Sequence, residues 1–582
     1  MSGVLRPSPA LSIGASDFRS LREQDRLYVD KSAFVARVLD DPGAVILLPR
    51  PRRFGKTTNL STLRYFLEKA DEDRSALFAD LAIWRETRLR EHFGRYPVLW
   101  VTFKDVKKPS WDACFALTRE LLGELYSQHR YLLDDELLTA DEAAIFREIL
   151  AQRAAQPHCE LALRNLCRFL RRHHRQPVVI LIDEYDTPIH AAFSAGYYDQ
   201  AIDFFRTLLG AALKDNEDLF KGVLTGILRI AKESIFSGLN NLRVYSLLHP
   251  RYGDSFGFTE AEVIDLAARA GYQGELAELR DWYNGYLFGD TVIYNPWSIL
   301  NALADGRCSV YWVNTGSNDL IDELLMRQGA SPHEDIERLL RGEGIRKPIV
   351  ENTVLRDVYL DEDAMWSFLL FCGYLKASEL GRDGVREIAT LSIPNLEVRE
   401  VFNSLFRTWL RRGLGGEREV EGLTRALLAG DTEAVEQRLR RLLTESASYF
   451  DTAGNSVEMP AEQVYHAFVL GLLVHLQPQY LVRSNRESGQ GRFDVMIVPR
   501  SAGGPGVVLE LKVKRKGETL KQALAKALKQ IETQDYAAEL RAVGASPIHK
   551  LAFAFDGKKV IAGALPGPRA ERVRSDSRPG SG

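Results

Sequence analysis

The sequence predicts an α/β protein: a parallel sheet flanked by helices in the N-terminal half, a helical middle region, and a smaller α/β domain near the C-terminal end. Short apolar runs alternate with amphipathic stretches up to about residue 230, which is typical of a parallel sheet. Two closely spaced apolar runs and a basic helical stretch form a separate pattern in the last quarter. With 582 residues, the chain is too long for one hydrophobic core, so several domains are expected.

Composition limits the classes of protein that remain. Hydrophobic residues at 45% and charged residues at 27% are ordinary globular values, and a net charge of −3 means that charge must be interpreted locally. The five cysteines are scattered without paired spacing, which favours reduced thiols over disulfides or a zinc site. No apolar run approaches the roughly 20 residues of a membrane helix, and residues 1–16 lack the apolar core of a secretory signal. We therefore expect a cytoplasmic protein with no membrane partner.

Four apolar runs are the expected strands of the first sheet: residues 44–48, 97–103, 178–182 and 220–230. They are nearly continuous in apolar side chains, which suits strands that are covered on both faces. The stretches between the second and third runs are amphipathic and rich in Arg, Glu and Leu, so they are expected to be the covering helices.

A basic turn, PRPRRFGKTT at residues 49–58, follows the first expected strand and precedes a helix expected over 56–69. A strand, a tight turn with Gly-Lys-Thr and a helix together form a phosphate site, because N–H groups at the helix N-terminus face the anion and the lysine adds a point charge. The usual pattern is G-x-x-x-x-G-K-[ST]. Arg50 replaces the first glycine and Pro51 removes one N–H donor, so the match is partial.

Acidic residues follow the third expected strand. Asp183 and Glu184 come directly after it, about 130 residues beyond the basic turn. A magnesium–nucleotide site needs a carboxylate at a strand end to hold the metal, and a second carboxylate can polarise the attacking water. Thr225 or Arg229, on the next apolar run, could sense the γ-phosphate; the alternatives are an ordinary strand hydroxyl and a surface arginine. Together with the basic turn, this order of motifs predicts a nucleotide triphosphatase site.

A second set of acidic residues lies in the last quarter. Asp494 begins an apolar run, and fifteen residues separate it from Glu510 in the strand pattern VVLELKVKR. Glu510 and Lys512 project to one face of that strand because side chains alternate with period two. The turn-forming link at residues 499–506 predicts a hairpin, and Glu462 lies on an amphipathic helix before it.

This set is what metal-dependent phosphodiester cleavage requires. Asp494 and Glu510 can hold Mg²⁺, Glu462 can complete the metal shell, and Lys512 can stabilise a developing oxyanion. Residues 507–530 carry a net positive charge, which suits a phosphate backbone. The alternative is an E-x-K pattern on a surface strand followed by a solvated lysine-rich helix.

The N-terminal half resembles the bacterial AAA-ATPase-like family in its YVDKSAF, RPRRFGKTTNLSTLRYF, VVILIDEYDTPI, GVLTGILRIAKESIFSGLNNL and GYLFGDTVIYNPWSIL segments. The family writes its phosphate loop as RPRRFGKS, which accounts for the missing glycine. The resemblance covers about residues 12–320 and implies a P-loop NTPase sheet that binds ATP and Mg²⁺, with Glu184 activating water. The expected nucleotide contacts are Arg52, Arg53, Phe54, Gly55, Lys56, Thr57, Thr58, Asp183 and Arg229, of which Thr57 and Asp183 also hold the metal.

The last domain resembles the PD-(D/E)XK nuclease superfamily, with its restriction-endonuclease-like α/β fold. Phe493 stands where the superfamily name has proline, but the acid, acid and lysine that follow are all present. The resemblance implies Mg²⁺-dependent cleavage of nucleic acid. Its expected catalytic residues are Glu462, Asp494, Glu510 and Lys512, with Asp494 and Glu510 as metal ligands.

The middle region changes in composition along its length. Residues 237–315 are rich in Asn, Gly, Tyr and Trp, which suits binding loops and a small helical lid. Residues 318–400 suggest a winged-helix-like module, and a helical pair broken at Gly430-Asp431 suggests a connector. The expected organisation is a disordered N-terminus (1–16), an AAA-ATPase-like P-loop NTPase domain (17–320), a helical lid and connector (321–455), a PD-(D/E)XK nuclease-like domain (456–563) and a disordered tail (564–582).

The expected function is ATP hydrolysis that gates or drives a fused Mg²⁺-dependent nuclease, with DNA as the substrate rather than RNA, in defence against foreign DNA. One alternative is a nucleotide-switched signalling or scaffold protein whose last domain binds nucleic acid without cutting it. Another is an ATP-dependent protein remodeller, which would need an arginine finger from a neighbouring subunit and a pore loop. Homo-oligomerisation is therefore left open at this stage.

Overall fold

The chain divides into two compact units. The first comprises Met1–Gln328 and Gly342–Glu400, and the second Gly329–Arg341 and Val401–Gly582. The first unit thus includes residues 342–400, which the sequence assigned to the connector. The computed structural model describes residues 11–134, 137–227, 241–312, 324, 331–340, 342–351, 355–413, 417–445, 469, 473, 476, 479–488, 491–515, 517–533, 536–556 and 559–565.

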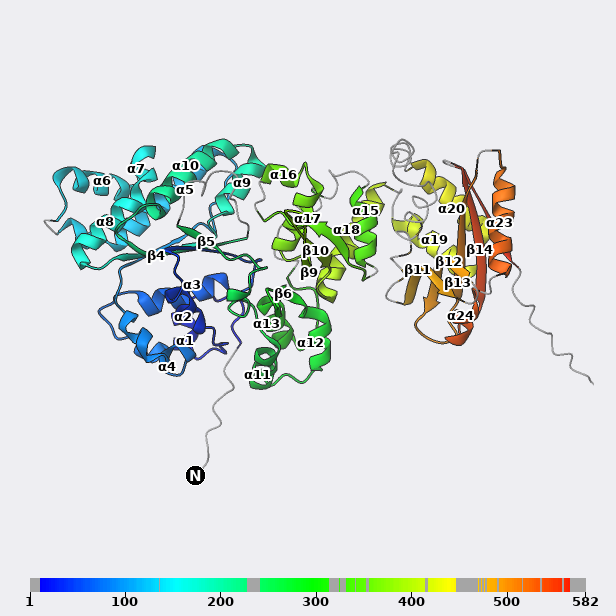
Figure 1. Cartoon of the computed structure of the whole chain (residues 1–582), viewed down its shortest axis with the longest axis horizontal. Coiled ribbons are helices and arrows are strands. Elements are labelled where there is room, and N and C mark those ends of the chain that lie inside the picture. Colours follow the sequence, from blue (N-terminus) through cyan, green and yellow to red (C-terminus); the bar gives the residue numbers. More distant parts are fainter. Residues whose placement is uncertain are drawn as a thin grey trace, which may run out of the picture. The chain divides into compact units, whose positions relative to one another are not determined.

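A five-stranded parallel sheet forms the centre of the first unit, in the order β2-β3-β4-β1-β5. Figure 1 shows α5 and α10 on one face of this sheet and α2 and α3 on the other. The predicted α/β fold with a parallel sheet is confirmed, but the chain inserts β4 between β1 and β3. The strands are β1 (Val45–Pro49), β2 (Val98–Thr102), β3 (Val178–Asp183), β4 (Leu219–Gly226) and β5 (Leu242–Val244).

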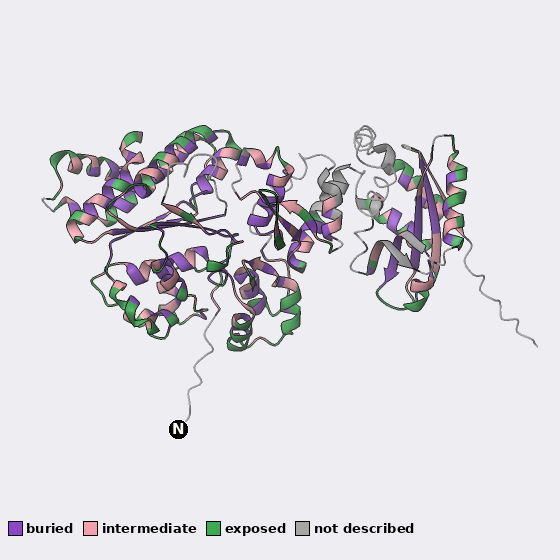
Figure 2. Ribbon diagram, viewed as in Figure 1, coloured by how far each residue is buried: buried purple, intermediate pink, exposed green. Residues whose placement is uncertain are grey.

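The apolar runs form the core of this sheet. All residues of β1 and β3 are buried, as expected for strands covered on both faces, and Figure 2 shows the strands of this sheet mainly in the buried colour. The helices of this part are α1 (Phe18–Glu23), α2 (Ala33–Leu39), α3 (Lys56–Leu67), α4 (Ala82–Arg85), α5 (Trp111–Gln128), α6 (Ala140–Leu150), α7 (Gln156–Glu160), α8 (Ala162–His174), α9 (Thr187–Ala195) and α10 (Tyr198–Leu213), with 3₁₀ turns at Ser75–Leu77, Thr87–His92 and Arg130–Leu133.

The YVDKS segment joins elements of the first unit and does not reach the phosphate loop through any described hydrogen bond. Asp30 accepts hydrogen bonds from the backbone N–H groups of Ser32 at 2.8 Å and Ala82 at 2.7 Å. Lys31 pairs with Glu262 at 2.6 Å. These contacts tie the start of α2 to α4 and to the helix α11 (Glu260–Ala270), so the segment has a structural role.

The remainder of the first unit contains a helical cluster and two small sheets. The hairpin β6 (Tyr286–Phe288) and β7 (Thr291–Ile293) lies between the helices α12 and α13, and a three-stranded sheet has the order β8-β10-β9. The other elements are a 3₁₀ turn (Pro250–Tyr252), α11 (Glu260–Ala270), α12 (Leu276–Tyr283), α13 (Pro296–Asp305), β8 (Ile345–Pro348), α16 (Leu355–Val358), α17 (Glu362–Phe371), β9 (Lys376–Asp383), β10 (Arg386–Ser392) and α18 (Leu396–Gly413), whose later residues belong to the second unit.

A mixed five-stranded sheet, ordered β11-β12-β13-β14-β15, forms the core of the second unit. Figure 1 shows α23 on one face and α19 and α20 on the other, and the predicted C-terminal α/β fold is confirmed. Only the pair β13–β14 is parallel. The elements are α15 (Ser331–Leu340), α19 (Glu417–Ala429), α20 (Thr432–Glu445), β11 (Tyr480–Ser488), β12 (Gly491–Pro499), β13 (Gly506–Val513), α23 (Leu520–Thr533), α24 (Ala538–Ala542), β14 (Ile548–Asp556) and β15 (Lys559–Leu565).

The state of the cysteines and the character of the helices can be compared with the predictions from composition. All five cysteines are free thiols, as predicted. Among the helices in the described ranges, none combines the length and apolar character needed to cross a bilayer.

A cluster of two histidines and a tyrosine makes the stability of the first unit sensitive to acid. The Tyr131 hydroxyl lies 2.9 Å from Nε2 of His174 and 3.3 Å from Nδ1 of His129. Burial lowers the pKa of both histidines from 6.5 to about 4. A depressed pKa favours the neutral ring in the folded state, so the stabilisation is complete above pH 6.5 and is lost as the pH falls towards 4.

We therefore expect the free energy of unfolding to fall between pH 7 and 5. In a variant with Gln in place of both histidines, the free energy of unfolding should decrease by about 1–2 kcal/mol less between pH 7 and 5 than in wild type. This value takes into account that solvent screens the partly exposed rings. Urea unfolding of wild type and of the His129→Gln/His174→Gln variant at the two pH values measures the difference. An identical pH dependence in both proteins would rule out this source of acid sensitivity.

Candidate functional site

The candidate phosphate loop joins the end of β1 to the start of α3. Gly55 is the N-cap of α3 and has φ +84°, a left-handed conformation that favours glycine. A Cβ at this position would meet no atom within 4 Å, so the space over the helix N-terminus is open. Backbone N–H groups of the first helical turn face this space, which is the arrangement that binds phosphate.

Lys56, the first residue of α3, is almost fully buried beneath that space. Its ammonium group donates hydrogen bonds to the carbonyls of Arg50 and Pro51, each at 3.2 Å, and pairs with Glu184 at 3.2 Å. The loop therefore curls around the lysine, and the same ammonium contacts the acidic residue that follows β3.

The next contact links the loop to the ends of β3 and β4. Asp183 accepts hydrogen bonds from the hydroxyls of Thr57 at 2.8 Å and Thr225 at 2.7 Å. Burial, and after it the charge of Glu184, raises the pKa of Asp183, while the two hydroxyl donors oppose this shift. One buried carboxylate thus connects the phosphate loop with two strand ends, and the contact of Thr225 in this structure is with Asp183.

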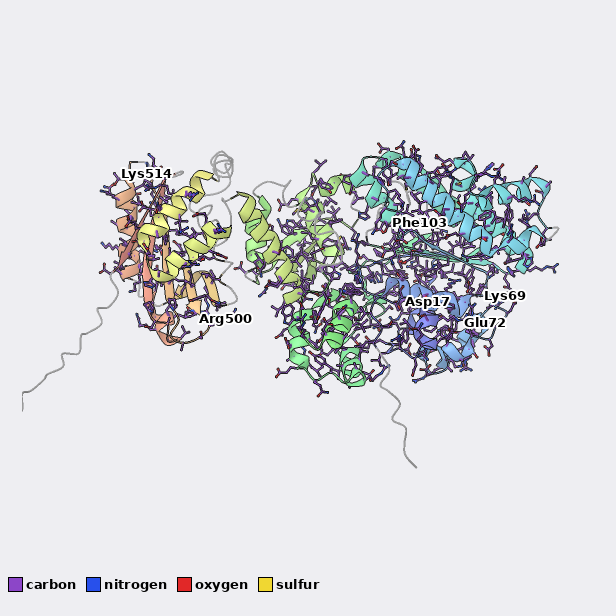
Figure 3. The ribbon with its side chains drawn as sticks, turned by 180° about the vertical axis from the view of Figure 1, so that it is seen from behind. Asp17, Lys69, Glu72, Phe103, Arg500 and Lys514 are labelled. Atoms are coloured by element: carbon purple, nitrogen blue, oxygen red, sulfur yellow. The ribbon has the colours of Figure 1, made fainter. Side chains whose placement is uncertain are left out.

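Glu184 has a backbone conformation that is unusual for its residue type. Its φ is +52°, in the left-handed region, and the N–H of the next residue, Tyr185, donates to the carbonyl of Thr225 at 3.0 Å. Strained residues of this kind cluster at functional sites, because the surrounding structure must hold them in place. On the other side of β3, the N–H of Phe103, labelled in Figure 3, donates to the carbonyl of Asp183 at 3.0 Å.

Arg50, in the place of the first glycine of the usual pattern, is fully buried. Its guanidinium donates to the carbonyls of Pro49 and Tyr245, each at 2.7 Å, and lies over the rings of Phe256 and Phe288 at 5.0 and 5.5 Å from their centroids. Burial lowers the pKa of Arg50 to about 9. The side chain anchors the loop to the core and points away from the phosphate space.

The other loop residues differ in exposure. The guanidinium of Arg53 lies 3.5 Å from the ring centroid of Trp297, and its main chain has φ +67°. Phe54 is fully buried against Tyr286 and Phe288, so only its backbone can face a nucleotide. Arg52 borders a cavity of about 360 Å³ whose lining also includes Lys107, Thr187, His190, Phe193 and Tyr359.

Two of the residues proposed from the sequence lie outside the described ranges. These are Arg229, the candidate sensor, and Glu462, the candidate third acid of the nuclease site. Thr225, the other candidate sensor, lies near the end of β4, and the remaining expected site residues of the first unit lie on the loop, on the first turn of α3 or at the end of β3.

The second candidate site lies on one face of the C-terminal sheet. The pairing Val495↔Leu509 and Met496↔Val508 places Asp494 opposite Glu510, one position beyond the last paired residues. Both side chains point to the face that α23 covers, where Met496, Val508 and Ala527 form part of the core. The predicted hairpin therefore brings the two acids together.

The contacts at this point join the acids to the lysine. An oxygen of Asp494 accepts a hydrogen bond from the backbone N–H of Leu511 at 2.8 Å. Glu510 is fully buried and its carboxylate pairs with the ammonium of Lys512 at 2.9 Å. Asp494 and Lys512 are only partly buried, so the site opens to solvent on their side.

Tyr536 is a polar residue of this site that was not predicted from the sequence. Its side chain is buried and its hydroxyl accepts a hydrogen bond from Gln530 of α23 at 3.1 Å. Burial raises the pKa of Tyr536, the hydrogen bond from Gln530 opposes the shift, and the charges of Glu510 and Asp494 add to it. The tyrosine therefore lies near the two acids.

Ion pairs neutralise part of the basic stripe near this site. Lys514, labelled in Figure 3, pairs with Asp556 at 2.7 Å, and Lys526 pairs with Glu518 at 2.7 Å. Lys521 and Lys529 are exposed on α23. The positive charge available to a phosphate backbone is therefore smaller than the residue count in the sequence suggests.

The donor sets fit divalent metal ions to different extents. In the first site, a hydroxyl and a carboxylate are 2.8 Å apart beside a helix N-terminus, which matches the oxygen ligands of magnesium in nucleotide sites. In the second site, two carboxylates converge. Within the described part of the chain, no group of three or more His, Cys, Asp or Glu side chains is placed to hold a metal ion.

Comparison with known proteins finds a family match for each of the two regions that contain the candidate sites. Residues 12–236 match the family described as a predicted AAA-ATPase, and residues 460–564 match the PD-(D/E)XK nuclease superfamily. A protein of Azotobacter chroococcum mcd 1, named "Uncharacterized protein in vnfD 5'region", is 28% identical over 570 residues, which cover 95% of this chain and 98% of that protein. The similarity therefore runs through both matched regions.

The family matches agree with the fold of each unit and with the motifs from which the resemblance was first inferred. They cover the phosphate loop, the end of β3 and the hairpin that carries Asp494 and Glu510. The chain joins a domain of the predicted AAA-ATPase family to a domain of the PD-(D/E)XK nuclease superfamily.

Proposed function

We propose that this protein hydrolyses ATP and that its nucleotide state gates or drives a fused Mg²⁺-dependent phosphodiesterase that acts on nucleic acid, DNA rather than RNA. The observation that carries the proposal is the hydrogen bond of 2.8 Å between Thr57 and Asp183, residues 126 positions apart. It brings the phosphate loop and a strand-end carboxylate together, as a magnesium–nucleotide site requires. A cytoplasmic location and a role in defence complete the proposal, by analogy with other fused ATPase–nucleases.

In the first site, the N–H groups of the α3 N-terminus and the Lys56 ammonium bind the nucleotide phosphates. Thr57 and Asp183 supply the oxygens that hold Mg²⁺, which when bound neutralises phosphate charge. Glu184 orients the attacking water, and its contact with Lys56 places it beside the phosphate space. The remaining proposed nucleotide contacts are Arg52, Arg53, Thr58, Arg229 and the backbones of Phe54 and Gly55.

In the second site, Asp494 and Glu510 hold the metal, which when bound supplies an activated water and neutralises the scissile phosphate. Lys512 holds the water or the developing oxyanion, and its contact with Glu510 fixes the ammonium beside the acids. Glu462 is proposed as the third acid.

A second function is favoured by two observations. Among the described residues, the metal-binding side chains of the second site number fewer than three, and two nearby lysines are taken up in ion pairs. A C-terminal domain that binds nucleic acid without cutting it would make the protein a nucleotide-switched signalling or scaffold ATPase.

Phosphate release and nucleic-acid cleavage, measured together, test the proposal. We expect Mg²⁺-dependent release of phosphate from ATP that rises when duplex DNA is added, and cleavage of plasmid DNA that depends on Mg²⁺ and responds to ATP. RNA in place of DNA is the matched control for substrate class. ATP turnover without cleavage of either nucleic acid would favour the scaffold function, and absence of turnover would overturn the proposal for the first site.

A further inference from the structure

Trp312 holds the phosphate loop from outside the nucleotide space. Its indole Nε1 donates a hydrogen bond to the carbonyl of Arg52 at 3.1 Å. Only 5% of the tryptophan is exposed, and its ring packs against Tyr374 with centroids 4.9 Å apart. Gly373 permits this packing, because a Cβ there would lie 2.9 Å from Pro51 and 3.6 Å from the Trp312 ring. The loop is therefore braced by an aromatic side chain far along the sequence.

A buried carboxylate fixes Trp312 in turn. Glu397 is fully buried, and its Oε1 accepts hydrogen bonds from the backbone N–H groups of Tyr311 and Trp312, both at 2.7 Å. Its Oε2 accepts from the hydroxyl of Ser298 at 2.7 Å. Burial raises the pKa of Glu397, and these donors oppose the shift. The side chain thus ties the backbone at Trp312 to the first turn of α13.

Glu397 occupies the first turn of α18, the helix Leu396–Gly413. Residues up to Glu400 belong to the first compact unit, and residues from Val401 onward belong to the second. The chain passes from one unit to the other at three points, and at the last of them, between Glu400 and Val401, the connection is the continuous helix α18. Its beginning is attached to the loop through Glu397 and Trp312.

We propose that Trp312 is a positioning residue for nucleotide binding and that Glu397, by fixing Trp312, makes the geometry of the phosphate loop depend on the first turn of α18. The inference rests on the proposed binding of ATP at Lys56. A loop that is already ordered loses less freedom when it binds phosphate, so the brace increases affinity. Thermodynamic linkage then requires nucleotide binding to order Trp312 and the start of α18 by the same free energy.

The test removes the indole N–H and keeps an aromatic ring. Trp312→Phe should weaken binding of the fluorescent nucleotide mant-ADP, in the presence of Mg²⁺, about fivefold, which corresponds to one hydrogen bond of about 1 kcal/mol. Trp366→Phe is the matched control, because Trp366 is likewise a buried tryptophan of the first unit and its indole N–H donates to a glutamate, Glu362, at 3.0 Å. Both variants should lose similar thermal stability, and the control should bind mant-ADP as wild type does.

A second measurement separates positioning from stability. In wild type and in Trp366→Phe, Mg²⁺ and ADP should slow hydrogen exchange of the amides of α18. In Trp312→Phe, at a nucleotide concentration that saturates the protein, this slowing should be lost.

The identity of the carboxylate gives an independent check. Glu397→Gln can keep both backbone donors on its remaining oxygen while the Ser298 hydroxyl turns to accept from the new amide, so its affinity should stay close to wild type. Glu397→Leu removes all three hydrogen bonds and should behave like Trp312→Phe in nucleotide affinity and in exchange of α18.

The outcomes distinguish this inference from the function on which it rests. If wild type binds mant-ADP and Lys56→Ala does not, but Trp312→Phe and Trp366→Phe have equal affinities and equal exchange at α18, the brace is overturned and the nucleotide site stands. If wild type binds no mant-ADP, both the nucleotide site and the brace are overturned.

Discussion

Replacing Glu510 with Gln is expected to lower the rate of Mg²⁺-dependent DNA cleavage by more than about 100-fold, because loss of a group that only supports a metal ligand already costs 10- to 100-fold. Gln has nearly the same shape as the fully buried Glu510 side chain, and its amide oxygen can still accept a hydrogen bond from Lys512. It lacks the negative charge that would hold the metal. Plasmid nicking against time, with Mg²⁺ at several concentrations, gives the rate and the metal dependence.

Glu518→Gln is the matched control for this prediction. Glu518 lies in the same domain and forms an ion pair with Lys526. It has no described contact with Asp494 or Glu510. The control should cleave DNA at the wild-type rate, and thermal unfolding should show that both variants fold. Equal cleavage by Glu510→Gln and wild type would move the phosphodiesterase site away from this hairpin.

The second large effect concerns Lys56. Lys56→Ala should reduce ATP hydrolysis by about 10²–10³-fold, the size of effect seen when a single buried donor to a developing charge is removed. The ammonium lies inside the loop, and Arg50 cannot replace it, since that guanidinium is directed into the core. Phosphate release by purified protein, with Mg²⁺ and saturating ATP, measures the loss.

Lys69→Ala serves as the control for Lys56→Ala. Lys69, labelled in Figure 3, is an exposed lysine that follows α3. Its replacement by Ala therefore removes one positive charge near the same helix, as Lys56→Ala does. We expect its ATP hydrolysis to match wild type. Retention of hydrolysis in Lys56→Ala would place the nucleotide elsewhere, whereas loss in both variants would point to a general electrostatic effect.

The positions of the strands and of both acid pairs could be predicted from local patterns. Continuous apolar runs marked β1 and β3, and period-two alternation placed Glu510 and Lys512 on one face of β13. The order of the strands could not be predicted in this way, because periodicity reports burial and does not identify neighbours. The contact of Thr225 with Asp183 follows from that order, since β4 lies beside β3.

Long-range partners explain most of what the sequence did not reveal. Arg50 looked like a departure from a phosphate-binding pattern, yet it bonds the carbonyl of Tyr245, 195 positions away. Glu397 gave no local signal at all, because its Oε1 accepts hydrogen bonds from backbone N–H groups 85 and 86 positions earlier. Such residues become visible only when distant segments are brought together by the fold.

The burial of Arg50 also sets the smallest part of this chain that can fold around the loop. The match to the predicted AAA-ATPase family ends at residue 236, but the partners of the Arg50 guanidinium include Tyr245, Phe256 and Phe288. A fragment cut at residue 236 would leave this cation without its acceptor and its aromatic cover, at the floor of the loop. A fragment that keeps these contacts of the loop must therefore extend at least through Phe288, and a change at Tyr245, Phe256 or Phe288 would act on the phosphate loop although these residues lie far from it in sequence.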